Sequence, residues 1–356
     1  MANTAQKLST NQRMQYFAAL TRQNMHMLPT QETHMEHDTI QIILPKTRVL
    51  AKTYLQFEVD CSVKHASKTK FAPVHEYDLF NIVERIAMDV NVGFMPVSLT
   101  GKELAMFNTV TTHPHKLIGG GDRMVSHNEL VASTTGANNK YTFVLEVKNT
   151  LNDNMLNGLI MLQNQSTTVT MNIDIGMISK ILGGQDGYTA TLNGVKVTPM
   201  LVTYTIPKDE RAYPDVSILK VVHSKNEYFP TAGTKTVYLD CGMIYRKIVL
   251  YFEDENGVPM TPDKFTGKFE LRFNTADTPY SITPEMLKYL NIDQLGQKLP
   301  DGMYVFDFSS QSPLIGFGGN RDYIDTGKIT EFTLTFNSNV ACKTTIISER
   351  ISRLTV

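Results

Sequence analysis

The sequence predicts an all-β protein of two consecutive β-sandwich or jelly-roll domains. Its 356 residues are enough for two domains of roughly 150 to 180 residues each. After the first thirty residues, apolar side chains alternate with polar ones at period two, which is typical of strands with one buried face. Two stretches of the first half also recur in the second half, and the helix–strand rhythm that an α/β fold needs is missing.

The amino-terminal segment, residues 1–31, differs from the rest of the chain. Its charges come from Lys7, Arg13 and Arg22, and the first acidic residue is Glu32. The segment is therefore basic, although the whole chain is close to neutral.

This segment also has the pattern of an amphipathic helix. Ser9 or Thr10 can cap the helix, and Pro29 ends it. One stripe, at spacings of three, four and seven, consists of Met14, Phe17, Ala18, Met25 and Leu28. Two interpretations remain open: the helix packs on its own domain, or it leaves the body as an arm that contacts a neighbouring subunit or an anionic lipid surface.

Fourteen segments read as strands, seven in each half of the chain. In the first half they are Thr39–Leu44, Tyr54–Val63, Ile86–Phe94, Tyr141–Val147, Thr167–Ile175, Tyr188–Val197 and Met200–Ile206. In the second half they are Val216–Val222, Lys235–Leu239, Lys247–Phe252, Lys268–Phe273, Met303–Phe308, Thr330–Asn337 and Lys343–Arg353. Short helices are expected in loops at Gly101–Asn108 and Thr283–Leu290, and the second has a threonine cap followed by proline and glutamate.

The internal repeat fixes the domain organisation. Two sets of three alternating apolar residues match at an offset of 163 residues: Tyr141, Phe143 and Leu145 with Tyr304, Phe306 and Phe308, and Val169, Met171 and Ile173 with Phe332, Leu334 and Phe336. A charged segment with flanking prolines, 208–212, then reads as the linker between copies. We expect the first domain over 32–207 and the second over 213–356.

Composition restricts the function. With 34 basic and 35 acidic residues, no net field draws the chain to nucleic acid, so we expect no direct sequence-specific nucleic-acid binding. The content is 42% hydrophobic and only 19% charged, which favours a protein that hides surface in contacts with copies of itself. Three dispersed cysteines predict neither a disulfide framework nor a Cys-x-x-Cys metal site. We also find no secretory signal and no apolar run of membrane-spanning length.

No catalytic, cofactor or metal site is predicted. His34 and His37 lie with Glu36 and Asp38 near the entry to the first strand, and His113 and His115 flank a proline, but neither group has the spacing of a complete metal site. Gly119–Gly121 lacks the Gly-Lys-Ser/Thr of a phosphate loop and reads as a turn, as do Gly183–Gly184 and Gly316–Gly319. Glu253–Glu255 precede an Asn-Gly pair and read as a hairpin tip.

These features together resemble the major capsid proteins of the tectiviruses, tailless phages with an internal membrane, and most of all the Bacillus-infecting branch. The likeness covers the whole chain and rests on the basic arm from Gln6 to Leu28, on the paired stretches Tyr141–Ile175 and Tyr304–Asn337, and on total length. It implies a double jelly roll of two eight-stranded barrels, and a homotrimer of pseudo-hexagonal outline that tiles an icosahedral shell.

The resemblance also implies partners and a location. The expected partners are further copies of the chain, minor capsid and vertex proteins, and the internal lipid membrane, with assembly in the host bacterial cytoplasm and a final place in the virion. Lys7, Arg13 and Arg22 would face anionic head groups or a neighbouring capsomer, with Met14 and Phe17 as apolar anchors. The alternatives are a phage receptor-binding or glycan-binding β-sandwich protein, and an enzyme whose site is assembled from dispersed residues.

Overall fold

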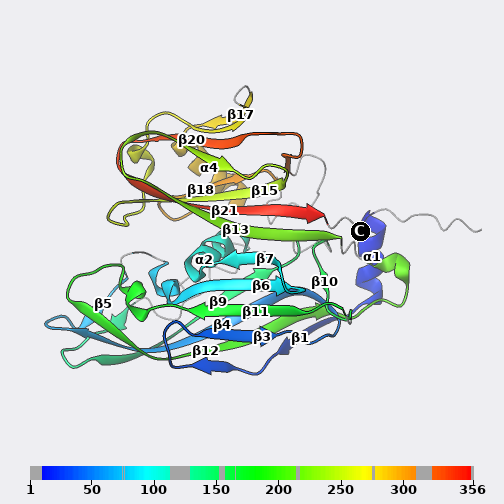
Figure 1. Cartoon of the computed structure of the whole chain (residues 1–356), viewed down its shortest axis with the longest axis horizontal. Helices are drawn as coiled ribbons and strands as arrows, with labels where there is room; N and C mark the ends of the chain where they lie inside the picture. Colours follow the sequence, from blue (N-terminus) through cyan, green and yellow to red (C-terminus); the bar gives the residue numbers. More distant parts are fainter. Residues whose placement is uncertain are drawn as a thin grey trace, which may run out of the picture.

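The computed structural model describes residues 10–73, 75, 77–112, 129–151, 157–164, 166–213, 217–274, 277–309 and 323–353. These residues form two β-sandwiches, one above the other in Figure 1, and the chain passes from the lower one to the upper one through a 3-10 helix at Glu210–Ala212. The predicted linker 208–212 includes this short helix. No helix in the described part is both long enough and apolar enough to span a membrane.

The first barrel consists of two four-stranded sheets. One has the order β1 (Gln23–Met27), β12 (Tyr188–Tyr204), β4 (Val49–His65) and β9 (Ala137–Lys148), and the short strands β2 (Gln31–Thr33) and β10 (Ile160–Met161) extend it. The other has the order β3 (Thr39–Ile43), β11 (Val169–Ile175), β6 (Val83–Val90) and β7 (Phe94–Leu99). A separate small ribbon pairs β5 (Lys70–Phe71) with β8 (Leu130–Val131).

The second barrel repeats this architecture. One sheet has the order β13 (Ile218–Phe229), β21 (Cys342–Arg353), β15 (Ile244–Asp254) and β18 (Met303–Asp307), with β19 (Ile324–Asp325) against β15. The other has the order β14 (Gly233–Leu239), β20 (Phe332–Ser338), β16 (Phe269–Phe273) and β17 (Asp277–Ile282).

Both barrels have jelly-roll topology. When the eight main strands of each barrel are numbered along the chain, with β1 and β2 together as the first of the lower barrel, one sheet runs first–eighth–third–sixth and the other second–seventh–fourth–fifth. A helix joins the fifth strand to the sixth in each: α2 (Gly101–Thr111) and α4 (Pro284–Leu295). The segments that match at the offset of 163 lie on β9 and β18, the sixth strands, and on β11 and β20, the seventh. The sequence repeat therefore reflects equivalent places in two copies of one fold.

Three predicted strands differ from the structure. The strand predicted over Ile86–Phe94 is two strands, β6 and β7, because the chain turns between them at Asn91 and Val92, which have positive φ angles of 57° and 52°. The two strands predicted over Tyr188–Val197 and Met200–Ile206 form the single strand β12, which runs along β4 with two register shifts.

The amino-terminal helix was predicted to reach Leu28, and this was wrong. Helix α1 (Thr10–Leu20) ends eight residues earlier, and residues 23–27 form β1, paired antiparallel with the end of β12. The backbone of this segment forms ladder hydrogen bonds with β12 and becomes the edge strand of its sheet, a long-range choice that the local helical spacing does not reveal.

The core shows why the strands alternate, and where they do not. In β4 the inward residues Leu55, Phe57 and Val59 are buried while their neighbours are partly exposed. In β15, by contrast, nine consecutive residues from Tyr245 to Glu253 are buried, because one face of the strand lies in the second barrel and the other meets the first barrel. A fully buried strand of this kind loses its period-two pattern.

Candidate functional site: the inter-barrel contact and the amino-terminal helix

Helix α1 packs on its own chain through Phe17. This side chain is 1% exposed, in a small cluster with Val49, Ala51 and Leu159, and its ring meets the ring of Tyr204 edge-on at 5.4 Å between centroids. Burial of a phenylalanine of this kind contributes roughly 1.5–3 kcal/mol. The Phe17 ring is therefore packed within its own molecule, and its expected part in contacts with a membrane or neighbour stays a prediction.

The other residues expected to make the arm's contacts have different surroundings. Arg13 and Met14 are half-buried on α1, and Arg22 lies exposed beyond the helix, where its backbone N–H donates to Thr205 Oγ1 at 2.9 Å. Lys7 lies outside the described residues. The large apolar side chains of α1 that are exposed are Tyr16 (45% exposed) and Leu20 (49%).

The acidic and histidine residues near the first strand take up separate structural contacts. Glu36 accepts a hydrogen bond from the N–H of Ile178 at 2.9 Å, Asp38 accepts one from Thr33 Oγ1, and His34 Nδ1 lies 2.7 Å from the carbonyl of Asn193. In the described part of the chain, no three His, Cys, Asp or Glu side chains converge as a metal site would require. His113, His115, Gly119–Gly121 and Gly316–Gly319 lie outside the described residues.

A direct contact joins the two barrels. β7, the fifth strand of the first barrel, pairs in parallel with β13, the first strand of the second, at Val97–Val222 and Ser98–His223. The pairing turns two four-stranded sheets into one continuous sheet across the molecule (Figure 1). The larger hydrophobic cluster spans this contact, since Val249, Tyr251 and Ile347 of the second barrel belong to the same cluster as the first barrel's core.

Helix α2 fills the space between the barrels. Thr100 caps it, accepting a hydrogen bond from the N–H of Glu103 while the Glu103 carboxylate accepts one from the N–H of Thr100, a complete capping box. The Glu103 carboxylate also accepts hydrogen bonds from Ser224 Oγ (2.8 Å) and Asn226 Nδ2 (3.0 Å) on β13. At Gly101, any Cβ would lie 2.5 Å from the Phe80 carbonyl oxygen. The close approach of the start of this helix to the Phe80 backbone therefore requires glycine.

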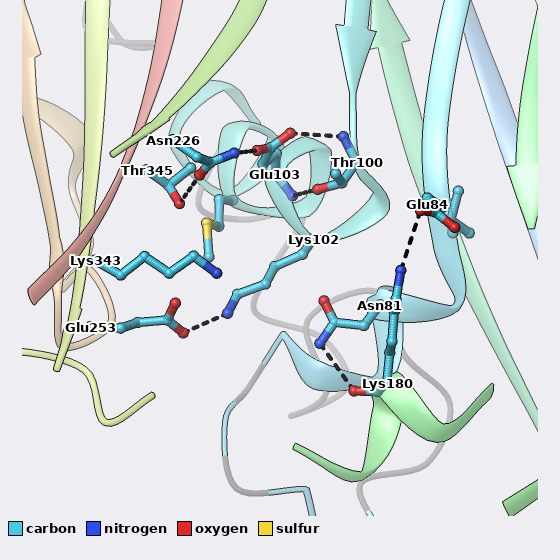
Figure 2. A pocket seen from close by; sticks show the side chains of 12 residues that line it. Asn81, Glu84, Thr100, Lys102, Glu103, Lys180, Asn226, Glu253, Lys343 and Thr345 are labelled. Atoms are coloured by element: carbon cyan, nitrogen blue, oxygen red, sulfur yellow. Dashed lines mark hydrogen bonds and ion pairs between the residues drawn. The ribbon is translucent and has the colours of Figure 1, made fainter. Parts of the chain in front are cut away.

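A polar cleft of about 290 Å³ lies between the barrels beside α2. Figure 2 shows Lys102 reaching from α2 to Glu253 on β15, with 2.6 Å between Nζ and Oε1. The Lys102 ammonium also lies 5.1 Å from the centre of the Tyr251 ring. Glu253 was expected at a hairpin tip; it is buried instead, and the turn begins at Asp254, whose Oδ1 accepts the N–H groups of Asn256 and Val258.

Buried charges continue this contact on the second barrel. Glu349 (1% exposed) receives a hydrogen bond from Arg246 Nε at 2.9 Å. Burial alone would raise the pKa of Glu349, but Lys220, Arg246 and Lys247 together hold it at about 2. Burial lowers the pKa of Lys220 to about 8, although Glu349 opposes this effect. Lys247 is also paired, with 2.6 Å to Asp307 Oδ2.

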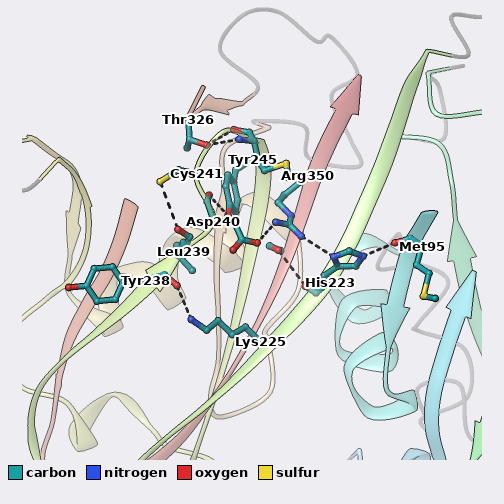
Figure 3. A network of polar contacts seen from close by, with 12 residues as sticks. Met95, His223, Lys225, Tyr238, Leu239, Asp240, Cys241, Tyr245, Thr326 and Arg350 are labelled. Carbon is teal, nitrogen blue, oxygen red and sulfur yellow. Dashed lines mark hydrogen bonds and ion pairs between the residues drawn. The ribbon is translucent and has the colours of Figure 1, made fainter. Parts of the chain in front are cut away.

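A histidine, His223, bridges the two barrels beside these buried charges. As Figure 3 shows, His223 lies between Arg350 on β21 and Met95 on β7. The Arg350 guanidinium lies 3.0 Å from His223 Nδ1 and can only donate, so Nδ1 accepts. His223 Nε2, 2.7 Å from the carbonyl oxygen of Met95, must then carry the proton. Arg350 also pairs with Asp240 at 2.5 Å.

The two loop helices make the same contact with the strand that follows them. The Asn108 carboxamide bonds both the carbonyl and the N–H of Glu146 on β9, and the Asn291 carboxamide does the same with Val305 on β18. The sequence contains a second repeated pattern that marks this helix–strand contact, apart from the repeat of the strands. It is a threonine cap, then leucine four residues on and asparagine eight residues on. These residues are Thr100, Leu104 and Asn108 in the first copy, and Thr283, Leu287 and Asn291 in the second.

The structure thus places the predicted residues in contacts other than those expected. It also brings together charged side chains that the sequence analysis did not pair. Lys102 and Glu253 are 151 residues apart, and Arg246 and Glu349 are 103 apart. Neither pair has a local motif. The one usable signal was the presence of charged residues inside predicted strands of the second half.

Several solved structures share this fold over nearly its whole length. The match to the STIV MCP covers 92% of this chain and 96% of that protein, at 12% identity and a TM-score of 0.65. The PBCV-1 virus capsid covers 93% and 94%, at 10% identity and a TM-score of 0.62. The major capsid protein P2 from bacteriophage PM2 covers 94% and 98%, at 11% identity and a TM-score of 0.57. No family model and no curated protein matches the sequence. At these identities the similarity establishes the fold, a double jelly roll.

Proposed function

We propose that the chain is a structural subunit of an icosahedral virus shell and that its function is self-assembly, not catalysis. The observation that carries this proposal is the match of both barrels together, over more than nine-tenths of each chain, to proteins whose names identify them as viral capsid proteins. The inter-barrel contact adds support, because a shared sheet, a buried helix and the Lys102–Glu253 ion pair join the two barrels into one block suited to tiling.

The more specific proposal follows the resemblance to tectivirus capsid proteins. Three copies would form a pseudo-hexagonal trimer of six barrels, and trimers would tile a shell around an internal membrane with minor capsid and vertex proteins. Weak contacts between trimers can then sum to a stable shell, since each additional contact is made within an existing assembly.

Helix α1 has a narrower role in this proposal than the sequence suggested. Phe17 fastens the helix to its own barrel. Among the described residues of the arm, those that suit contact with a neighbour or a lipid surface are the apolar Tyr16 and Leu20 and the basic Arg13 and Arg22. Basic side chains beside exposed apolar ones suit an anionic surface.

The purified, full-length chain tests the main proposal. Three chains of 40.0 kDa give a trimer of about 120 kDa by light scattering, and electron micrographs of expressing cells should show shells or flat lattices. A 40.0 kDa monomer that binds a glycan and forms no lattice would contradict the proposal and favour a receptor-binding protein.

The arm needs a separate experiment, and the structure sets its limits. Because β1 starts at Gln23 and belongs to the barrel, the deletion should remove residues 1–20 and no more. We expect the truncated chain to remain folded but to bind vesicles containing anionic lipid less well than the full chain. Equal binding by both chains, together with normal lattice formation, would show that the arm serves neither partner.

A further inference from the structure

Within the chain, the first barrel contacts the second through its fifth strand and the helix that follows. β7 pairs with β13, the first strand of the second barrel, and α2 meets the same strand through the hydrogen bonds of Glu103 with Ser224 and Asn226. Further along α2, the carbonyl of Thr109 accepts a hydrogen bond from Gln297 of the second barrel at 2.6 Å. One molecule therefore contains a complete example of how two such barrels join.

The second barrel has the same strand and helix, and the described chain leaves them uncovered. β17 is the last strand of its sheet, and its first five residues are exposed. On α4, three apolar side chains form a stripe on the outer face: Met286 is 52% exposed, Tyr289 is 67% exposed and Ile292 is 45% exposed. Residues three apart on a helix share a face, so these side chains form one continuous surface.

The stripe corresponds to the buried contact face of α2. The threonine caps and the asparagines that bond the next strand, Asn108 and Asn291, match the two helices residue by residue. In this match Met286, Tyr289 and Ile292 correspond to Glu103, Met106 and Thr109, which are 5%, 1% and 4% exposed. The positions that contact the second barrel on α2 are thus apolar and open on α4.

The matching surface is also open on the first barrel. β1 takes the place in the first barrel that β13 takes in the second, and it lies at the edge of its sheet with only β12 beside it in the described chain. Met25 and Met27 on β1 are 65% and 56% exposed. A groove of about 260 Å³ runs between β17 and α4, and unbranched methionine side chains fill irregular apolar grooves well.

We propose that the α4 stripe and the edge of β17 bind the β1 edge of a second copy of this chain. The occupant is a second copy because the chain itself supplies both halves of the contact and already joins its own barrels in the same way. This inference rests on the proposed function and specifies the surface by which copies meet. The contact is head-to-tail, so it generates a ring of alternating barrels when the rotation closes.

Surface variants test the assignment on the full chain. We expect Tyr289→Ser combined with Ile292→Ser to raise the dissociation constant of the oligomer about tenfold or more, since aromatic residues dominate the energy of interfaces. Met25→Lys on the opposite surface should have the same effect. Tyr238→Ser is the matched control, because Tyr238 is 62% exposed on β14, away from both surfaces. Circular dichroism establishes that each variant is folded.

Cross-linking gives a second readout that does not depend on weakened assembly. In a Cys241→Ser background, where Cys61 and Cys342 are buried, chains with Tyr289→Cys are mixed with chains carrying Met25→Cys and oxidised. We expect disulfides between the two kinds of chain. Cross-links only between chains of one kind, or none in an intact oligomer, would overturn the surface assignment and leave the shell proposal standing. A monomeric wild-type chain would overturn both.

Discussion

Glu349→Gln removes the carboxylate that three buried cations surround, while leaving the shape of the side chain almost unchanged. The cations hold the pKa of Glu349 at about 2, against 4.5 for a free glutamate. At ~1.4 kcal/mol for each factor of ten in acidity, this corresponds to about 3 kcal/mol of net stabilisation of the carboxylate. Breaking a buried ion pair from one side costs a similar amount, roughly 3–5 kcal/mol, because the remaining charge stays buried. We therefore expect the free energy of unfolding to fall by about 3 kcal/mol.

Urea unfolding of the full chain at neutral pH measures this loss as a lower midpoint with an unchanged slope. Glu270→Gln is the control: Glu270 pairs with Arg272 at 2.5 Å, but both side chains are partly exposed, so we expect a loss of less than about 1 kcal/mol. Adding Lys220→Met to Glu349→Gln should recover part of the loss, since it removes a buried ammonium group.

The pH dependence follows from the sign of the shift. A folded-state pKa below the unfolded value gives stability that is present above pH 4.5 and is lost as the pH falls towards 2. The difference between wild type and Glu349→Gln should therefore shrink over this range. A loss no larger than that of Glu270→Gln at neutral pH, or a difference unchanged from pH 5 to pH 2, would refute the reasoning.

Three further outcomes are expected. Phe17→Ala should cost roughly 3 kcal/mol by leaving a cavity under α1, and it should make helix α1 sensitive to protease; Tyr16→Ala, at a 45% exposed position, should do neither. Asn291→Ala leaves both backbone groups of Val305 without their partner, so we expect a loss of about 2 kcal/mol in urea unfolding. Burial lowers the pKa of Lys220 to about 8 from 10.5. The free-energy cost of burying its ammonium group is therefore full below pH 8 and fades towards pH 10.5. Wild type should accordingly gain stability relative to Lys220→Met over that range, and a constant difference would contradict the assignment.

The sequence predicted the strands of the barrels well where one face meets the core and the other meets solvent. The triplets led by Tyr141 and Tyr304 lie on equivalent strands because the side chains that fill a jelly-roll core must recur when the fold is duplicated. The short helices were also found, since their caps are local: Thr100 and Thr283 each accept a hydrogen bond from the backbone of the first turn.

The amino-terminal segment shows the limit of local patterns. Spacing placed Met25 and Phe17 on one helical stripe, but Met25 lies on a strand and Phe17 is buried against the first barrel. Helical spacing over two or three turns is weak evidence when an open sheet edge offers the same backbone a ladder of hydrogen bonds.

By itself the sequence determined the all-β class, the duplication and the helix caps, because these depend on side-chain alternation and on contacts within a few residues. Only the tertiary structure decided that β7 pairs with β13, that Glu253 meets Lys102, and that the charges around Glu349 are buried. A strand with one polar face reads the same whether that face meets water or a second barrel. The pattern along a strand records that one face differs from the other, and the neighbour that covers each face is set by residues a hundred or more positions away.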